Sequence, residues 1–309
     1  MKNDDNKSDE LIGEIDELTE SDLPRFLQRF KFQTPEWFRE ALAEFMGMFI
    51  LVVFVIGASA QATLSNGTLG NSLSTSLTGT IALTMALYWA LAISGCHINP
   101  AVTLGFASVQ RFPLSKVPIY VASQMLGSIT SAAVAYALYH DAIDHYDGGV
   151  RRVLGPNGTA GIFTSFPQPF VSNFTGFCDQ FFGTAMLLAL IFALVDKKNE
   201  SKPTAGLAPI AIGLVVVLIG MTFGYNCGCP INPALDLGPR IFTAMAGWGK
   251  EVFTAHNNWS WIPPVACSLG GIAGAYLYVL TVEIHRKPET KKNKIDTDNE
   301  QIAIDTIQK

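Results

Sequence analysis

The chain has 309 residues, 49% of them hydrophobic and 15% charged, and a formal net charge of −5 at pH 7. The acidic excess is local, with nine acidic residues within residues 4–22, and no basic patch with interleaved aromatic residues occurs anywhere. This composition argues against a nucleic-acid-binding protein. Long stretches without any charge, described below, argue against a soluble protein of two domains.

Residues 1–33 are polar and acidic, and they are expected to form a cytoplasmic tail. No apolar stretch occurs in the first thirty residues, so we expect no cleavable signal peptide. A single domain is expected over 34–286, and a second charged cytoplasmic tail over 287–309.

Five windows between these tails lack Asp, Glu, Lys and Arg: residues 45–110, 117–140, 180–195, 203–235 and 252–282. A bilayer core is ~30 Å thick and requires ~20 apolar residues of helix to cross. The windows therefore predict six transmembrane helices, at 38–61, 72–93, 115–139, 175–195, 205–224 and 261–283. The fold class is an all-α membrane protein, since a bundle of helices satisfies its own backbone in lipid.

Basic residues predict the orientation. The two tails with the adjoining Arg39 and Arg286, and the turns at 111–116 and 197–202, hold seventeen of the twenty-one Lys and Arg residues. Six spans place all four segments on one side, so both termini should be cytoplasmic, in the plasma membrane. Four glycosylation acceptors then face outward: Asn66, Asn157, Asn173 and Asn258.

Two related stretches interrupt this pattern, Ser94-Gly-Cys-His-Ile-Asn-Pro-Ala and Gly228-Cys-Pro-Ile-Asn-Pro-Ala. Asn is a favourable helix cap and Pro suits the first helical position. Each triplet, Asn99-Pro100-Ala101 and Asn232-Pro233-Ala234, is therefore predicted to begin a short re-entrant helix at membrane depth. Two such starts would bring two amides and two positive dipole ends to one place, as expected in a pore.

The chain contains an internal repeat. Glu44-Phe-Met-Gly lies 55 residues before Asn99, and Gln180-Phe-Phe-Gly lies 52 residues before Asn232. Each half, at 37–140 and 172–285, holds three spans. Because three is odd, the second half must be inverted, and inverted repeats place their shared site near the midplane. Glu44 and Gln180 are expected to hold the re-entrant loops.

The chemistry at this site favours passage of uncharged solutes. Asn99 and Asn232 can donate hydrogen bonds, neighbouring backbone carbonyls can accept them, and facing dipole ends repel cations. His97 is expected near the pore entrance, as a lining residue or a packed neutral side chain, with pH-dependent gating as a further possibility. Five cysteines and five histidines show no metal-ligand spacing, so we expect no metal and no cofactor.

Over residues 37–285 these motifs resemble the aquaporin family of major intrinsic proteins, and within it the animal aquaglyceroporins. The resemblance rests on both Asn-Pro-Ala stretches, on Asp236 after the second triplet, on Gly238-Pro-Arg-Ile-Phe, on Ala246-Gly-Trp-Gly-Lys-Glu-Val-Phe and on Phe166-Pro-Gln-Pro-Phe. It implies a homotetramer, with one pore per subunit for water and small polyols. Asp236 is the mark of the polyol branch.

The resemblance also implies an outer filter formed by Gly79, Gly220, Cys229 and Leu235. Leu235 departs from the family, which has an arginine there. Arg240 lies about 140° further around the helix and is not expected to replace it. Small residues without a fixed charge predict a wide filter for water, glycerol and urea, with lactic acid as a further candidate; alternatively, Leu235 forms an apolar plug.

Two other classes share some of these features. A secondary transporter would need intramembrane ionisable groups, for which only Glu44 and Asp179 qualify. A structural membrane protein would have a closed pore. An enzyme is not expected, because no nucleophile, base and orienting acid converge at the triplets.

Overall fold

The computed structural model describes residues 34–286. The chain divides into two compact units, Met1–Arg39 and Glu40–Lys309. Residues 34–39 are the described part of the first unit, and the second unit contains the remaining described elements. The tails predicted at 1–33 and 287–309 lie outside the described residues.

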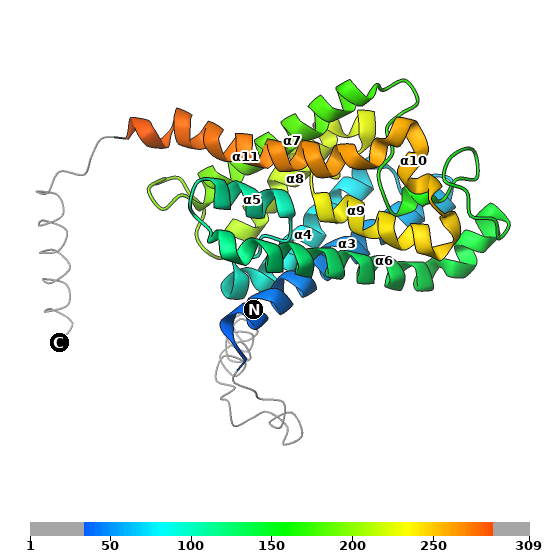
Figure 1. The fold of residues 1–309 in the computed structure, drawn as a ribbon, viewed down its shortest axis with the longest axis horizontal. Coiled ribbons are helices and arrows are strands. Elements are labelled where there is room, and N and C mark those ends of the chain that lie inside the picture. Colours follow the sequence, from blue (N-terminus) through cyan, green and yellow to red (C-terminus); the bar gives the residue numbers. More distant parts are fainter. Residues whose placement is uncertain (1–33, 287–309) are drawn as a thin grey trace, which may run out of the picture. The chain divides into compact units, whose positions relative to one another are not determined.

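The described residues form helices joined by loops (Figure 1). The α-helices are α3 (Glu36–Leu64), α4 (Ser72–Ser94), α5 (Pro100–Ser108), α6 (Val117–Asp147), α7 (Asn173–Val195), α8 (Ala208–Cys227), α9 (Pro233–Thr243), α10 (Glu251–Asn258) and α11 (Ile262–Thr281). Short 3-10 or π turns occur at Leu114–Lys116, Ala160–Ile162, Ala244–Trp248, Trp259–Trp261 and Glu283–His285.

Within residues 34–286, six helical segments are long and apolar enough to cross a membrane, which confirms the predicted number of spans. The predicted bounds agree with the helices except at some ends. Helix α6 continues to Asp147, well beyond the predicted limit of 139. Hydropathy marks where a helix leaves the apolar layer, whereas the helix itself ends at Asp147, and Gly148 caps it with a left-handed φ of 71°.

Helices α5 and α9 are too short to cross a bilayer. They contain 9 and 11 residues, which correspond to about 14 Å and 17 Å at 1.5 Å per residue. Asn99 and Asn232 cap them, and proline follows each cap at the first helical position. Both short helices therefore begin where the sequence predicts.

The two halves of the second unit pack in the same way. A Cβ added to Gly127 of α6 would lie 2.4 Å from the carbonyl oxygen of Phe45 in α3. In the second half, a Cβ on Gly270 of α11 would lie 2.3 Å from the carbonyl oxygen of Phe181 in α7, and these two helices run side by side (Figure 1). Small residues allow such close approach of helices in membranes. The same kind of close helix contact therefore occurs at matching places in both halves, as expected for the predicted repeat.

Candidate functional site

The N-termini of α5 and α9 meet through an exchange of hydrogen bonds. The Asn99 Nδ2 donates to the carbonyl oxygen of Ile231 at 2.9 Å, and the Asn232 Nδ2 donates to that of Ile98 at 2.8 Å. Each Asn also caps its own helix, since its Oδ1 accepts from the backbone N–H of Ala101 or Ala234, at 2.9 Å and 3.0 Å. Because the two helices meet at their N-termini, they point in opposite directions, and both positive dipole ends face one place.

The residues before the two Asn caps have an unusual backbone. Ile98 has φ of 38° and Ile231 has φ of 35°, and both side chains are buried. A β-branched residue is rarely found at positive φ, and such a conformation costs energy. Here it accompanies the turn that presents the Ile98 and Ile231 carbonyls to the opposite Asn amide.

Glu44 holds the first re-entrant loop. Its side chain is fully buried, and Oε1 accepts hydrogen bonds from the Ser94 Oγ at 2.7 Å and the His97 backbone N–H at 2.8 Å. Oε2 accepts from the Ile98 N–H at 2.6 Å and from the Gln124 Nε2 at 2.7 Å. Four donors therefore surround the carboxylate, which compensates for its removal from water.

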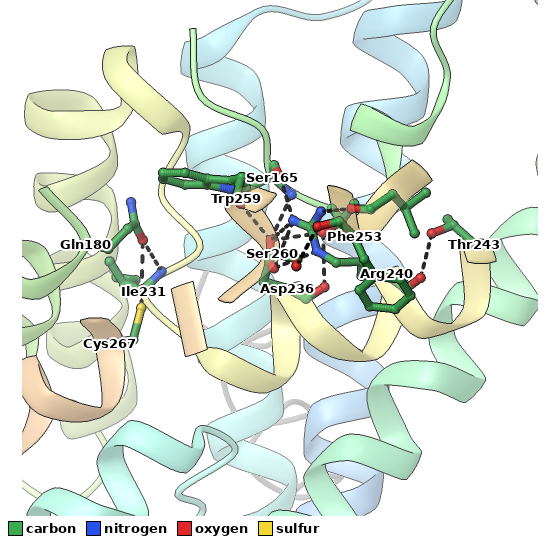
Figure 2. Close-up of polar contacts among 12 residues, drawn as sticks. Ser165, Gln180, Ile231, Asp236, Arg240, Thr243, Phe253, Trp259, Ser260 and Cys267 are labelled. Carbon is green, nitrogen blue, oxygen red and sulfur yellow. Dashed lines mark hydrogen bonds and ion pairs between the residues drawn. The ribbon is translucent and has the colours of Figure 1, made fainter. Parts of the chain in front are cut away.

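Gln180 occupies the equivalent position in the second half and makes weaker contacts (Figure 2). Its Oε1 accepts from the Ile231 N–H at 3.3 Å and from the Cys267 Sγ at 3.8 Å. Its Nε2 donates to the Asp179 Oδ1 at 3.0 Å and to the Cys227 Sγ at 3.3 Å. In both halves this side chain accepts a hydrogen bond from the backbone N–H of the Ile before the Asn cap, at 2.6 Å in the first half and 3.3 Å in the second.

A cavity of about 1270 Å³ passes beside the two Asn caps. Its lining includes Asn99, Asn232 and residues at both ends of α4, from Ser72 to Ser94. It also includes parts of α3, α5, α7, α8 and α9. The cavity therefore extends along the bundle for the whole length of α4 and contains the place where the short helices meet.

The four predicted filter residues, Gly79, Gly220, Cys229 and Leu235, all line this cavity. A Cβ added to Gly220 would lie 3.9 Å from the Cys229 Cβ, so these two residues are neighbours. Arg111, near the opposite end, is the one lining residue with a charged side chain among the residues described, and it pairs with Glu283 at 2.5 Å. Among the residues described, no charged side chain therefore lines the cavity at the predicted filter.

Arg240 does not replace the missing filter arginine (Figure 2). It is fully buried, is absent from the lining, and forms an ion pair with Asp236 at 3.0 Å. Its Nη1 donates to the carbonyl oxygen of Val252 and its Nη2 to that of Ser165, both at 2.7 Å. Leu235 is therefore left without a cationic neighbour from α9.

The sequence of this chain matches a known protein family over most of its length. The family model described as "Major intrinsic protein" matches residues 31–278. The chain belongs to the major intrinsic protein family. The resemblance predicted from the sequence is confirmed.

Relatives of this major intrinsic protein include human aquaporins. Aquaporin-10 of Homo sapiens is 42% identical over 270 residues, covering 87% of this chain and 89% of that protein. Aquaporin-9 of Homo sapiens is 44% identical over 247 residues, covering 80% of this chain and 83% of that protein. The X-ray structure of the aquaglyceroporin from Plasmodium falciparum superposes with a TM-score of 0.72 at 29% identity, covering 80% of this chain and 97% of that chain.

Family and fold together give the general function. The six apolar helices and the family make this major intrinsic protein a multi-pass membrane protein. It is a passive channel of the kind that conducts water, glycerol and other small solutes, and members of the family are not enzymes.

His97 lies in the lining of this major intrinsic protein, close to an aromatic cluster. Its ring stacks on Phe106 at 5.2 Å between centroids and makes edge contact with Phe112 at 4.7 Å. Its Nδ1 lies 3.2 Å from the Thr103 Oγ1. The side chain is thus both a packed histidine and a lining residue, which combines the two interpretations from the sequence.

The four glycosylation acceptors have different surroundings. Asn66, Asn157 and Asn258 are exposed, whereas Asn173 is half-buried at the start of α7. The Asn173 Nδ2 donates to the carbonyl oxygen of Asn257 at 2.9 Å. The Asn173 Nδ2 thus uses one of its two hydrogens for this contact.

Sequence reasoning missed one part of the lining. Residues 161–165 of the loop between α6 and α7 line the cavity. Asp236 fixes this segment, since its Oδ1 accepts from the Thr164 Oγ1 at 2.9 Å and from the Ser165 N–H and Oγ at 2.9 Å and 2.6 Å. No residue pattern in the loop indicates which part of it reaches the pore.

Proposed function

We propose that this major intrinsic protein conducts water, glycerol and urea through a wide outer filter without a fixed charge. One observation carries the proposal. A single cavity contains both Asn caps together with Gly79, Gly220, Cys229 and Leu235. Two glycines and a cysteine leave more room than larger side chains would, and Leu235 supplies no charge. Lactic acid, in its uncharged form, is a further candidate solute.

The Asn pair supports selective passage of uncharged solutes. Each Asn Nδ2 uses one hydrogen for the opposite Ile carbonyl, and an amide nitrogen carries two. Asn99 therefore has a second hydrogen to offer to a passing oxygen, while the Asn232 Nδ2 also faces the Met48 Sδ at 3.9 Å. The facing positive helix ends oppose cations and interrupt a proton-conducting chain of water.

We assign supporting roles to three residues around the pore. Glu44 and Gln180 position the two re-entrant loops through the contacts described above. Asp236 positions the segment at 161–165 and the Arg240 side chain. None of the three lines the cavity, so each affects the pore only by positioning the backbone or side chains to which it is hydrogen-bonded.

The remaining expectations from the sequence become part of this proposal. The channel domain covers 34–286, with repeats at 37–140 and 172–285, and assembles as a homotetramer in a lipid bilayer. The basic residues support cytoplasmic termini and location in the plasma membrane. Asn66, Asn157 and Asn258 are favoured for glycosylation over Asn173 by their exposure.

Flux through reconstituted protein tests the filter. Proteoliposomes with the parent chain and with Leu235→Arg are compared for water, glycerol, urea and lactic acid. Arginine would narrow the filter and add a charge, so we expect lower glycerol and urea flux with water flux retained. Leu235→Met, which conserves volume and charge, is the matched control. Higher glycerol flux in Leu235→Arg would instead show that Leu235 acts as a plug.

A further inference from the structure

One face of α4 lines the cavity and changes character along its length. Lining residues recur every three or four positions, as expected for one face of a helix. In order, they are Ser72, Leu73, Thr75, Ser76, Gly79, Leu83, Leu87, Leu91 and Ser94. Apart from Leu73, the wall is polar on the N-terminal side of the filter residue Gly79, and it is apolar from Leu83 to Leu91 on the other side.

Helix α3 contributes a serine at the same level. A Cβ added to Gly79 would lie 3.8 Å from the Val55 Cγ2, and one added to Gly70 would lie 3.3 Å from the Ala62 Cβ. Residue numbers thus rise along α3 where they fall along α4, so the helices are antiparallel. Ser59 follows Val55 by about one turn, and Ser76 precedes Gly79 by about one turn. Both serines line the cavity one turn beyond the filter.

The Ser59 and Ser76 hydroxyls are uncommitted. Neither makes a hydrogen bond within residues 34–286, not even to the carbonyl four residues earlier in its helix. Other nearby hydroxyls of the lining, apart from those of Thr63 and Ser72, already make hydrogen bonds. The Thr75 Oγ1 donates to the Asn71 carbonyl oxygen at 3.0 Å, and the Thr164 and Ser165 hydroxyls donate to Asp236.

The Ser76 hydroxyl lies against the filter itself. A Cβ added to Gly220 would lie 3.3 Å from the Ser76 Oγ and 3.9 Å from the Cys229 Cβ. Glycine at 220 leaves this side of the hydroxyl uncovered. The four filter residues carry no strong side-chain hydrogen-bond donor, because a thiol is a weak one. Ser76 therefore brings the nearest such donor to this part of the wall.

We propose that Ser76 and Ser59 form a recognition site for the hydroxyl groups of a small polyol, directly outside the filter. The inference rests on the proposed function and names the residues that discriminate among its solutes. A serine hydroxyl donates one hydrogen bond and accepts two, which matches the donors and acceptors of a polyol. Glycerol has three hydroxyls to remove from water and so depends on such partners more than water does.

Flux measurements on Ser76→Ala, Ser59→Ala and the double variant test the site, using full-length protein in proteoliposomes. Loss of one solute hydrogen bond lowers glycerol permeability by about threefold to tenfold. Water permeability should change by less than about twofold, because backbone carbonyls of the lining still serve the smaller solute. Thr222→Ala is the matched control. Its hydroxyl donates to the Leu218 carbonyl oxygen at 2.7 Å, outside the lining, and glycerol flux should equal that of the parent.

Gly220→Ala provides a second arm that keeps Ser76 in place. The added methyl group would cover the Ser76 hydroxyl and so remove the same contact as Ser76→Ala. The double variant should therefore lose less glycerol flux than the product of the two single losses. Unchanged glycerol flux in both serine variants, or equal losses for glycerol and water, would overturn the recognition site. A parent protein that conducts water but no glycerol would overturn the proposed function itself.

Discussion

Asp236 and Arg240 form a fully buried ion pair one helical turn apart on α9, with 3.0 Å between the Oδ2 and Nη2 atoms. The same pair ties three segments together, because Arg240 also reaches the carbonyl oxygens of Val252 and Ser165, and Asp236 accepts from the Ser165 hydroxyl (Figure 2). Arg240 therefore connects segments around the pore without lining it, whereas Leu235 lines the cavity.

Removal of one partner of this pair should destabilise the protein strongly. Asp236→Leu leaves the Arg240 guanidinium buried without its counter-charge, and such a change costs about 3–5 kcal/mol. We expect a large drop in the thermal midpoint of the detergent-solubilised protein. The double variant Asp236→Leu/Arg240→Met removes both charges and should lose less. A double variant that unfolds as early as the single one would contradict this account.

The sequence predicts the spans and the starts of the short helices because both follow from local rules. Hydropathy marks apolar segments, and the Asn-Pro pairs at Asn99 and Asn232 mark helix starts that need no knowledge of distant residues. The inverted repeat then follows from counting spans. These features are therefore accessible without a structure.

Other parts of the site depend on contacts that no local pattern encodes. The segment at 161–165 reaches the lining because Asp236, about seventy residues later, accepts its hydrogen bonds. The role of Ser76 depends on the space left by Gly220 in a different helix. Serines are common in membrane helices, and only the packing distinguishes a lining hydroxyl from one bonded to its own backbone.

Glu44→Gln should be far more harmful than loss of its counterpart in the second half. Each Glu44 oxygen accepts two hydrogen bonds, so an NH₂ group at either position would face two donors. We expect a loss of at least about 1.5–3 kcal/mol, typical of hydrogen bonds to a charged group. Gln180→Ala, which removes a 3.3 Å contact to the Ile231 N–H, should cost about 1 kcal/mol. Thermal midpoints in detergent compare the two, and equal shifts would argue against a special role for Glu44.

Gly274→Ala should separate α7 from α11. The added Cβ would lie 2.0 Å from the carbonyl oxygen of Ala185, which is backbone and cannot turn aside. Overpacking of this kind costs about 1–3 kcal/mol. Gly206→Ala is the control, since a Cβ there has no neighbour within 4 Å. We expect a lower thermal midpoint only for Gly274→Ala, and equal midpoints would show that the two helices adjust without cost.

Mercury should block the pore through Cys229. This thiol lines the cavity and is only half-buried. Cys96 also lines the cavity but is buried, as are Cys227 and Cys267. Swelling assays of the parent protein should show loss of glycerol flux after mercury treatment, and Cys229→Ser should keep its flux. Cys178 is exposed but outside the lining, so Cys178→Ser should remain sensitive. Block of Cys229→Ser equal to that of the parent would place the reactive thiol elsewhere.

Acid should weaken the contact between the end of α7 and the end of α11. The Arg286 guanidinium, which bonds to the Asp196 carboxylate, holds the pKa of that carboxyl well below its usual range. A carboxyl whose pKa is lower in the folded state stabilises the fold above its unfolded pKa of about 3.9, and that stabilisation declines as the pH falls further. Thermal midpoints measured from about pH 6 down to about pH 3 should therefore drop more steeply for the parent than for Asp196→Asn, which has no proton to bind at this position. Parallel pH profiles for the two proteins would show that the Asp196–Arg286 contact does not contribute to stability.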